Sequence, residues 1–423
     1  MGTRVRLPYG EGHLDVDIPT DNVDIFEPRP MTALSDPKDA FEQSITKPHI
    51  HTQGLRDQVS REANVVIVTP DRTRVFPREA IEWLLQALSH VRKKITILTG
   101  TGSHTPDTPA HLLKMFGEDI LRDHTVVSHS AYNDDELATV GTTPSGRPLR
   151  MNKLYTQADY TIGMGYVENH FMAGASGGHK AIVPGIADIQ TIMEYHSPQN
   201  IDSPHSTWGK LEGNPTQDFL RHCASQREMN FLVNFVLDDH RRFVRFDCGK
   251  VLEAHAAACE LLAKHSMIPA KQRYNIMVTT NKGHPADLNW YQGVKGATAA
   301  AEVIEPGGLI ISAAECREGF PDHGHFKKKL LSGMSFAELK EDLFRMHYAD
   351  SWEVLKLANI YLQKGASIAL KSLLPPDEVR RAGMEPIDDI AIRVEQALAR
   401  YGRHERVGII PSGFDAVPVP PKA

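Results

Sequence analysis

The sequence has little of what marks several large classes of protein. Its 423 residues include only four cysteines, scattered without CxxC spacing, which favours buried thiols over a disulfide framework. No stretch approaches the ~20 apolar residues that cross a membrane, and the two arginines near the start have no apolar run behind them. The formal net charge is -6, and no basic arm or stripe is present. We therefore expect a cytoplasmic protein without membrane or nucleic-acid partners.

The composition that remains is typical of a folded enzyme. Hydrophobic residues make up 41% of the chain and charged residues 24%, and both values lie in the globular range. A chain of 423 residues exceeds the size of one hydrophobic core, so two or three domains are expected. The 21 histidines are unusually many, which makes metal binding or proton transfer worth seeking.

Hydrophobic patterns predict an α/β fold with two doubly wound domains. Apolar residues spaced by two between Val5 and Ile18 predict an antiparallel flap. Strands over 64–70 and 95–100 enclose a helix over 78–91, which predicts the βαβ unit of a parallel sheet. The other expected elements are strands over 160–165, 275–280, 308–312 and 367–370, a hairpin over 231–247, and helices over 189–195, 250–265, 288–304 and 388–401 and near Ser335 and Trp352.

The polar segment Met267–Arg273, which contains a proline, is the best candidate for a linker. We place the domain boundary there, with an N-terminal domain over 1–266, a C-terminal domain over 274–423 and a cleft between them. The tail after Asp415 is expected to be disordered.

Ligands of open α/β sheets bind at the carboxyl ends of the strands, so the residues that follow each strand are the first candidates for a site. Asp71 and Arg74 follow the first central strand. An arginine fork there can hold a carboxylate through two hydrogen bonds, and the aspartate can orient it. A helix N-cap with surface arginines is an equally good interpretation of these residues alone.

The next strand ends in a glycine-containing turn from Thr99 to His104. Glycines let main-chain N–H groups converge on an anion, and the histidine stands at the end of the turn. A purely structural turn, with His104 as a capping side chain, is the competing interpretation. The position of the histidine at the carboxyl edge of a strand favours a functional role.

The most informative segment runs from His170 through glycines at 174, 177 and 178 to Lys180. This order predicts a phosphate cradle, with main-chain amides as donors and the lysine as the charge. It is not a Walker loop, because Ala181 stands where Ser or Thr is required. A partly desolvated lysine is equally suited to covalent attachment of a cofactor, and the residues alone leave both roles open.

His196, 16 residues after Lys180, is a solitary histidine at the end of a predicted helix. It lacks the HExxH or clustered Cys/His spacing of a metal site built from protein ligands alone, which argues against zinc-dependent hydrolysis. If it binds a metal, the other ligands must come from elsewhere.

These segments together resemble the nickel-dependent lactate racemase family along most of the chain. The spacing of His170, Lys180 and His196, within a Gly-Gly-x-Lys-x-x-x-Pro-Gly context, carries the resemblance in the first domain. The resemblance makes the N-terminal domain the cofactor-binding domain and the C-terminal domain the substrate and closure domain. In the second domain, the family's substrate-side tyrosine, glutamine and lysine correspond to Tyr291, Gln292 and Lys295.

The resemblance implies a nickel-pincer nucleotide, pyridinium-3-thioamide-5-thiocarboxylic acid mononucleotide with Ni(II), and maturation enzymes that supply it. Lys180 would hold this cofactor through the thioamide. His196 would be the one protein ligand of nickel, because a ring carbon and two sulfurs of the cofactor fill the other positions of a square plane. Further cofactor or phosphate contacts are expected from Asp71, Thr101, Ser176 and Gly177.

The implied activity is racemisation or epimerisation at C2 of a small 2-hydroxy acid, by reversible hydride transfer to the pyridinium ring. His104 and His170 match the family's acid/base pair, each acting as base for one enantiomer and as acid for the other. Domain closure is expected to complete the site. The residues expected to bind the substrate are Arg74, Tyr291, Gln292, Lys295 and Trp352.

His179 departs from the arginine expected before the lysine in lactate-specific members. A second hypothesis is therefore a C2 epimerase of larger sugar acids, whose extra hydroxyls would be bound by Asn169, His284 and Asn289. A non-catalytic carrier of the nickel cofactor is a third hypothesis, although a carrier needs no acid/base pair. A phosphate-binding module unrelated to racemases would explain only the loop around Lys180.

Overall fold

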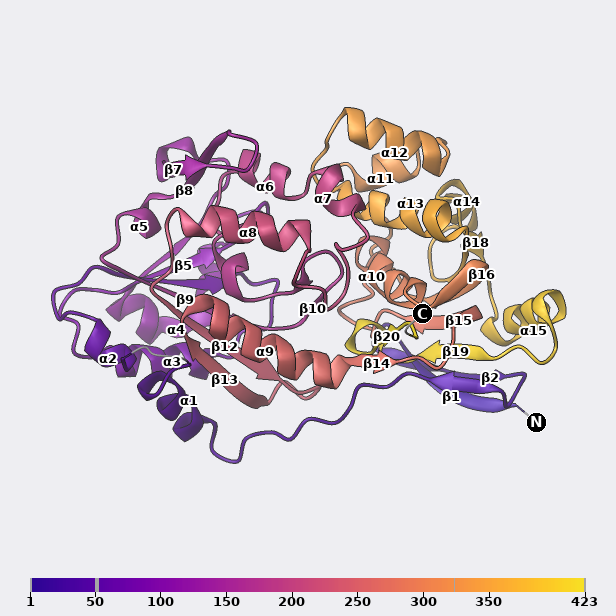
Figure 1. Ribbon diagram of the computed structural model, residues 1–423, viewed down its shortest axis with the longest axis horizontal. Coiled ribbons are helices and arrows are strands. Elements are labelled where there is room, and N and C mark those ends of the chain that lie inside the picture. Colours follow the sequence, from indigo (N-terminus) through magenta and orange to yellow (C-terminus); the bar gives the residue numbers. More distant parts are fainter. Residues whose placement is uncertain (1, 50–52, 323, 422–423) are drawn as a thin grey trace. The chain divides into compact units, whose positions relative to one another are not determined.

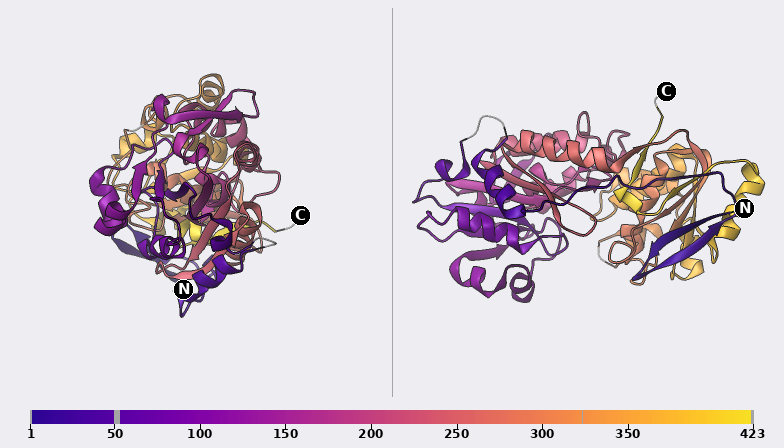
Figure 2. Two further views of the ribbon diagram at one scale, coloured as in Figure 1. Left: turned by 90° about the vertical axis from the view of Figure 1, so that its left-hand side faces the viewer. Right: turned by 90° about the horizontal axis from the view of Figure 1, so that it is seen from below.

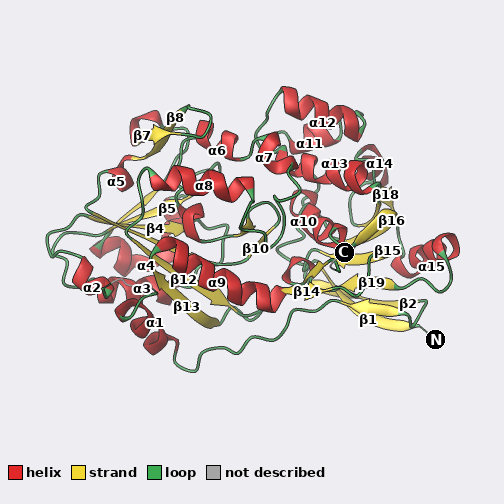
Figure 3. Cartoon of the chain, in the orientation of Figure 1, coloured by secondary structure: helices red, strands yellow, loops and turns green. Residues whose placement is uncertain are grey.

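The chain forms two compact units, each described here by itself (Figure 1, Figure 2). This computed structural model describes residues 2–49, 53–322 and 324–421. The N-unit comprises Met31–His196 and Gly209–Leu262. The C-unit comprises Met1–Pro30, Ser197–Trp208 and Ala263–Ala423. Each unit contains its own six-stranded sheet covered by other elements, so the predicted α/β class with two wound sheets is confirmed (Figure 3).

Six strands form the sheet of the N-unit: β4 (Val65–Pro70), β5 (Thr96–Gly100), β6 (Thr125–Ser128), β9 (Tyr160–Tyr166), β12 (Phe231–Leu237) and β13 (Phe243–Gly249). The chain passes from β4 to β5 and β6 on one side, then returns to β9, β12 and β13 on the other. All neighbours pair in parallel except β13, an antiparallel edge strand that forms the predicted hairpin with β12. The winding therefore reverses between β4 and β9.

The remaining elements of the N-unit connect these strands. Its helices are α1 (Pro37–Thr46), α2 (Leu55–Gln58), α3 (Arg78–Ala87), α4 (Pro109–Asp123), α5 (Lys153–Thr156), α6 (Ile189–Tyr195), α8 (Pro215–Ser225) and α9 (Val251–Ser266). Two short strand pairs are β7 (Leu137–Thr142) with β8 (Pro148–Asn152) and β10 (Asn169–His170) with β11 (Gly174–Ala175).

Burial on both faces explains why the central strand is continuously apolar. In β4, Val65 and Ile67 join the hydrophobic cluster that includes α3 and α4. Val66 and Val68 point the other way and join the cluster that includes α6, α8 and α9. A parallel strand covered by helices on both sides has no polar face, because successive side chains alternate between two buried layers.

The C-unit repeats this plan with parallel strands only. Its sheet has the order β18-β17-β16-β15-β19-β3, and the winding reverses between β15 and β19. The strands are β3 (Val23–Ile25), β15 (Tyr274–Thr280), β16 (Ile304–Ala313), β17 (Ser367–Lys371), β18 (Glu385–Pro386) and β19 (Val407–Ile410). The helices are α7 (Pro198–Asp202), α10 (Trp290–Ala301), α11 (Phe326–Leu330), α12 (Phe336–Arg345), α13 (Trp352–Lys364), α14 (Pro376–Arg381) and α15 (Ile390–Tyr401).

The N-terminal flap is an antiparallel pair, β1 (Thr3–Tyr9) with β2 (Gly12–Ile18), as predicted. Its place in the fold differs from the expected domain assignment. Val5, Leu7 and Ile18 of the pair join one hydrophobic cluster with α15 and with strands of the C-unit, and β3 adds an edge strand beside β19. The two units therefore divide the chain differently from the expected domains over 1–266 and 274–423, because Met1–Pro30 and Ser197–Trp208 both belong to the C-unit.

The predicted linker and the predicted disordered tail pair with each other. The segment after α9 contains β14 (Met267–Pro269), which pairs in parallel with β20 (Val417–Val419). Ala416 and Val417 are fully buried. The expectation of disorder after Asp415 was therefore wrong for this strand, because main-chain hydrogen bonding to a distant segment orders a stretch whose side chains show no clear pattern.

Two expectations drawn from composition can be compared with the fold. All four cysteines are buried free thiols, as expected. Among the described residues, no helix combines the length and the apolar character that a membrane span requires.

Candidate active site

The winding of the N-unit sheet brings three predicted segments to one edge. Asp71 directly follows β4, the turn Thr101–His104 follows β5, and His170 lies shortly after β9. The carboxyl ends of parallel strands meet at the same edge of a sheet, and the reversal point between β4 and β9 is where open α/β sheets bind ligands.

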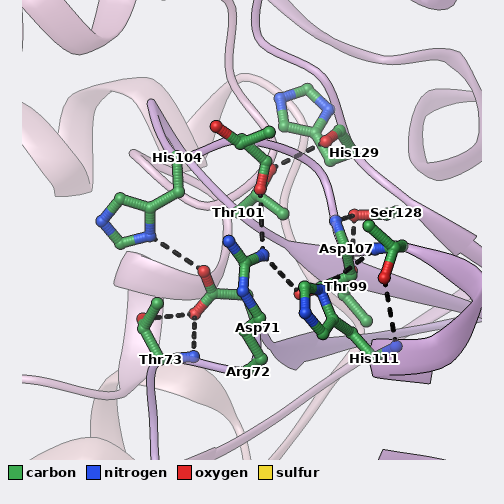
Figure 4. Close-up of polar contacts among 12 residues, drawn as sticks. Asp71, Arg72, Thr73, Thr99, Thr101, His104, Asp107, His111, Ser128 and His129 are labelled. Carbon is green, nitrogen blue, oxygen red and sulfur yellow. Dashed lines mark hydrogen bonds and ion pairs between the residues drawn. The ribbon is translucent and has the colours of Figure 1, made fainter. Parts of the chain in front are cut away.

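Asp71 and His104 form the best-defined contact of this edge (Figure 4). The Asp71 carboxyl group is 2% exposed, and its Oδ2 lies 2.8 Å from Nδ1 of His104. Its Oδ1 accepts hydrogen bonds from the main-chain N–H of Thr73, at 3.2 Å, and from the Thr73 hydroxyl, at 2.6 Å. Burial alone would raise the pKa of Asp71, but the hydrogen bond and charge of His104 and the hydrogen bond of Thr73 outweigh it, so the pKa is lowered.

An ionised Asp71 determines the tautomer of His104. A carboxylate at Nδ1 selects the tautomer with its proton on Nδ1, so Nε2 carries the lone pair that can accept a proton. The His104 side chain is 49% exposed, and solvent or a ligand can therefore reach the ring. The pair has the arrangement of a general base with its orienting carboxylate.

The two arginines that follow β4 differ in their surroundings. Arg72 Nη1 lies 2.8 Å from Oδ1 of the buried Asp107 and also donates to the carbonyl of Thr105, so this guanidinium holds the loop. Arg74 is exposed, and its main-chain N–H closes a turn by donating to the carbonyl of Asp71. The predicted carboxylate-binding residue, Arg74, is thus the more accessible of the two.

Thr101 is held by a neighbour that sequence reasoning missed. Its hydroxyl donates to the carbonyl of His129 at 2.8 Å, so this donor is already used within the fold. The His129 ring is fully buried, and it donates from Nε2 to the carbonyl of Ala187 and accepts at Nδ1 from Asn152. Burial lowers the pKa of His129 to about 4, which keeps the ring neutral beneath the site.

Two glycines of the third segment lie so close to neighbouring atoms that a side chain would not fit. Gly174 and Gly178 have positive φ angles, at which L side chains are strained. A Cβ on Gly174 would lie 2.3 Å from the main-chain oxygen of Lys210, and one on Gly178 would lie 2.6 Å from the ring of His255. Ser176 closes the loop, since its hydroxyl donates to Tyr166 and accepts from the N–H of Glu168.

The structure brings His170 and Lys180 together. Nδ1 of His170 accepts hydrogen bonds from the main-chain N–H groups of Met172 and Ala173, at 3.2 and 3.1 Å. In a neutral ring this places the proton on Nε2, which lies 3.3 Å from Nζ of Lys180. The same Nζ lies 3.1 Å from the hydroxyl of the buried Tyr195. The amine of Lys180 thus lies within hydrogen-bond distance of one imidazole and one phenol, both uncharged groups.

His196 follows α6 as its C-cap residue, next to Tyr195. Its Nδ1 lies 3.0 Å from the carbonyl of Ile192, and a carbonyl oxygen can only accept, so the proton is on Nδ1. The lone pair is then on Nε2, which is the usual state of a metal-binding histidine. Within the described part of the chain, no three His, Cys, Asp or Glu side chains gather so that they could hold a metal ion.

These donors fit the implied nickel-pincer nucleotide. Lys180 offers an amine beside a proton donor, His196 offers one imidazole nitrogen, and the glycines let the main chain approach a ligand closely. His179 does not add a cation to this set. It is 8% exposed, and burial, followed by the nearby His255 and Arg221, lowers its pKa to about 4.

The predicted substrate residues of the C-unit form two contacts. Lys295 Nζ donates to Oε1 of Gln292 at 2.6 Å, and Trp352 Nε1 donates to the hydroxyl of Tyr291 at 3.0 Å. Asn289, which was expected to bind a sugar hydroxyl, caps α10 through its side-chain oxygen. Sequence reasoning missed Glu353, the buried acid that follows Trp352.

Two family models match the chain. Residues 9–209 match the lactate racemase N-terminal domain, and residues 270–418 match the lactate racemase C-terminal domain. A lactate racemase from Thermoanaerobacterium thermosaccharolyticum is 31% identical over 425 residues, which cover 98% of both chains. A lactate racemase from Lactiplantibacillus plantarum is 32% identical over 392 residues, which cover 90% of both chains.

Solved structures match as well. The lactate racemase apoprotein from T. thermosaccharolyticum has a TM-score of 0.89 and 29% identity, covering 98% of this chain and 100% of that one. A Thermotoga maritima protein with a TM-score of 0.66 and 18% identity covers 90% of this chain and 97% of its own, and it shares the fold. Since the two family models together span most of the sequence and both curated relatives exceed 30% identity, the chain belongs to the lactate racemase family.

Proposed function

We propose that this protein racemises a 2-hydroxy acid at C2, with lactate as the first substrate to test. Both curated relatives are named lactate racemase. The observation that carries the proposal is the pair of histidines at one sheet edge with opposite proton placement. His104 has its lone pair on Nε2 because of Asp71, whereas His170 has its proton on Nε2 because of two main-chain amides.

Two histidines suit a reaction that must move the hydroxyl proton from two directions. The hydrogen on C2 of a 2-hydroxy acid is poorly acidic, so removal as a proton would need a costly carbanion. When bound, the nickel-pincer nucleotide supplies an electron-poor ring that accepts this hydrogen as hydride. His104 takes the hydroxyl proton of one enantiomer at Nε2, and His170, once protonated on both ring nitrogens, gives a proton from Nε2 to form the other, so each histidine alternates between the neutral ring and the imidazolium. The two roles exchange in the reverse direction.

The other expected residues are assigned as part of the same proposal. Arg74 is assigned to the substrate carboxylate, and Gln292 and Lys295, which contact each other, are assigned as further substrate contacts. Tyr291 and Trp352 complete the substrate-binding group. Lys180 carries the cofactor and His196 is its nickel ligand, while maturation enzymes are the expected partners.

The first experiment is intact-protein mass spectrometry with metal analysis, on protein produced together with cofactor-synthesis enzymes. Lactate racemisation is followed by chiral chromatography on the same samples. We expect a covalent adduct and stoichiometric nickel in the wild type. Lys180→Ala should lose the adduct, and His196→Ala should lose nickel while keeping the adduct. His205→Ala, an exposed histidine, is the control that should change neither.

The experiment that could contradict the proposal uses an expression host already shown to insert the cofactor into a known relative. If the folded wild type carries neither adduct nor racemase activity there, the proposal is wrong. If it carries the adduct but turns over only polyhydroxylated acids, the aldonic acid epimerase replaces the lactate racemase; the exposed His284 is then available for an extra hydroxyl.

A carrier without turnover predicts a different outcome. Replacing both His104 and His170 by Gln would leave a carrier fully loaded and biologically competent. A racemase would remain loaded but lose interconversion of the two enantiomers.

A further inference from the structure

A buried polar chain runs from Trp352 through Tyr291 to Glu353 in the C-unit. Tyr291 lies in the first turn of α10, and Trp352 and Glu353 lie in the first turn of α13, which packs against α10. The indole N–H of Trp352 donates to the Tyr291 oxygen at 3.0 Å. An indole N–H can only donate, so the Tyr291 oxygen accepts and its own O–H is left to donate. Its hydrogen-bond partner is the carboxyl group of Glu353.

Glu353 is an unusual residue for this position. Its side chain is 3% exposed, and Oε2 is buried without a hydrogen-bond partner among the described residues. A buried polar atom without a partner costs ~1–3 kcal/mol, whereas an apolar side chain would fill the same space without that cost. The largest compensation is the contact with Tyr291.

The surroundings of Glu353 favour its neutral form. Burial raises its pKa well above the usual value, and the charge of Asp350 raises it further. The hydrogen bond from Tyr291 and the charge of Lys295 oppose this shift only in part. A neutral carboxyl group accepts the hydrogen bond of the Tyr291 O–H on one oxygen and carries its own proton on the other.

We infer that Glu353 is a positioning residue of the substrate-binding group, which fixes the direction of the Tyr291 hydroxyl by accepting a hydrogen bond from it. This inference rests on the proposed function, because Tyr291 is assigned to the substrate there. A phenol whose proton is committed to Glu353 acts toward a ligand as an acceptor only. It therefore recognises the hydroxyl of a 2-hydroxy acid, which can donate, and not the carboxylate, which cannot at neutral pH.

Three single variants and one double variant of the loaded enzyme test this role through lactate racemisation. Glu353→Gln keeps a neutral acceptor and should retain kcat/KM to within about twofold. Glu353→Leu removes the acceptor and should lower kcat/KM by about tenfold, as expected for one buried polar contact. Tyr291→Phe should lose a similar amount. The double variant Tyr291→Phe/Glu353→Leu should be no worse than Tyr291→Phe, because Glu353 acts through Tyr291.

Several results would overturn the inference. These are full activity of Glu353→Leu, a loss in Glu353→Gln as large as in Glu353→Leu, or additive losses in the double variant. Circular dichroism shows whether each variant folds. If Glu353→Leu does not fold, Glu353→Met, which is similar in length and lacks the acceptor, takes its place.

An infrared difference spectrum of the apoprotein, wild type minus Glu353→Gln at pH 7, provides a measurement that does not depend on activity. We expect the C=O stretch of a protonated carboxyl group in the wild type. Finding only ionised carboxylate bands would contradict the neutral state of Glu353, on which the expected activity of Glu353→Gln depends, even if racemisation is fully established. Conversely, a protonated Glu353 in a protein without any racemase activity would refute the proposed function and leave the buried chain intact.

Discussion

The proposed roles of His104 and His170 in the N-unit depend on which ring nitrogen carries the proton. For His104 that choice depends on one buried carboxylate, Asp71, at 2.8 Å. For His170 it depends on the main chain, which no side-chain substitution removes directly. The two histidines therefore differ in how easily a mutation disturbs them, and His104 is the more vulnerable.

Replacing Asp71 by Asn should keep the shape of the site and change the tautomer of His104. An amide N–H directed at Nδ1 leaves the proton on Nε2, where a base needs its lone pair, so we expect kcat to fall by about 10²–10⁴-fold. Chiral chromatography of lactate with the loaded enzyme measures this. Asp107→Asn is the matched control, because Asp107 is also buried but binds Arg72 and not a catalytic histidine. Equal losses in both variants would contradict the assignment.

Lys180 should react in the apoprotein as a selected nucleophile. Because Lys180 is partly buried beside the uncharged His170 and Tyr195, and desolvation disfavours the ammonium form, we expect a mild acylating reagent at pH 7 to modify Lys180 faster than the exposed Lys210 of the same unit. Peptide mass spectrometry over a time course gives both rates in one sample. His170→Ala should reduce the rate at Lys180 and leave that at Lys210 unchanged. Equal rates at the two lysines in the wild type would show that the amine is not activated.

Among the elements, the loops beneath the site depend on neutral histidines. His129 joins the loop after β6 to the segment before α6, and His255 of α9 lies 2.9 Å from the carbonyl of Ser176 in the glycine loop. Burial is the main cause that lowers the pKa of each of these rings, and of His179, to about 4. The packing of the glycine loop on α9 is thus built from rings that must stay uncharged.

These histidines predict destabilisation by mild acid. Their folded-state pKa lies below the ordinary value of about 6.5, so between pH 6.5 and 4 the unfolded chain binds more protons. Stability should therefore fall as the pH is lowered through this window. His129→Gln should make the loss shallower by up to ~1.4 kcal/mol per pH unit. Thermal unfolding measured at a series of pH values tests this, with the exposed His240→Gln as control. An unchanged slope in His129→Gln would refute the idea.

At the scale of the whole chain, the C-unit combines segments that are distant in the sequence. The N-terminal pair β1–β2 covers the C-unit sheet, β3 extends it, and β20 pairs with β14. The stability of the C-unit therefore depends on residues from both ends of the sequence. Each of these segments contributes main-chain hydrogen bonds or an apolar face.

A single substitution in the flap should reveal this dependence. Leu7→Asp places an unpaired charge in the hydrophobic cluster of the C-unit and should cost at least about 3 kcal/mol of its stability. Arg6→Gln, on the exposed face of the same strand, is the control and should stay within about 0.5 kcal/mol, because it removes only exposed contacts such as the ion pair with Asp15. Limited proteolysis with peptide mapping distinguishes the units. We expect cleavage to increase in the C-unit only; increased cleavage in the N-unit alone would contradict the assignment of the flap.

The sequence by itself determined the features that depend on local pattern and side-chain chemistry. Continuous apolar runs such as β4 predict buried parallel strands, because each side chain reports its own burial. The chemical types at the strand ends, including His104, His170 and Lys180, likewise pointed to acid/base chemistry and a reactive amine before any contact was known. The matching spacing of His170, Lys180 and His196 was sufficient to indicate the family.

Only the tertiary structure determined which of these groups are in contact and which protonation state their surroundings favour. Asp71 orients His104 across 33 residues, and β14 pairs with β20 from nearly opposite ends of the C-terminal half. Neither contact has a local signal, because main-chain hydrogen bonds and buried ion pairs depend on distance in space and not on sequence spacing. Glu353 illustrates the limit most clearly. In the sequence it is an ordinary charge in a helix, and only its burial in the folded chain raises its pKa well above the usual value.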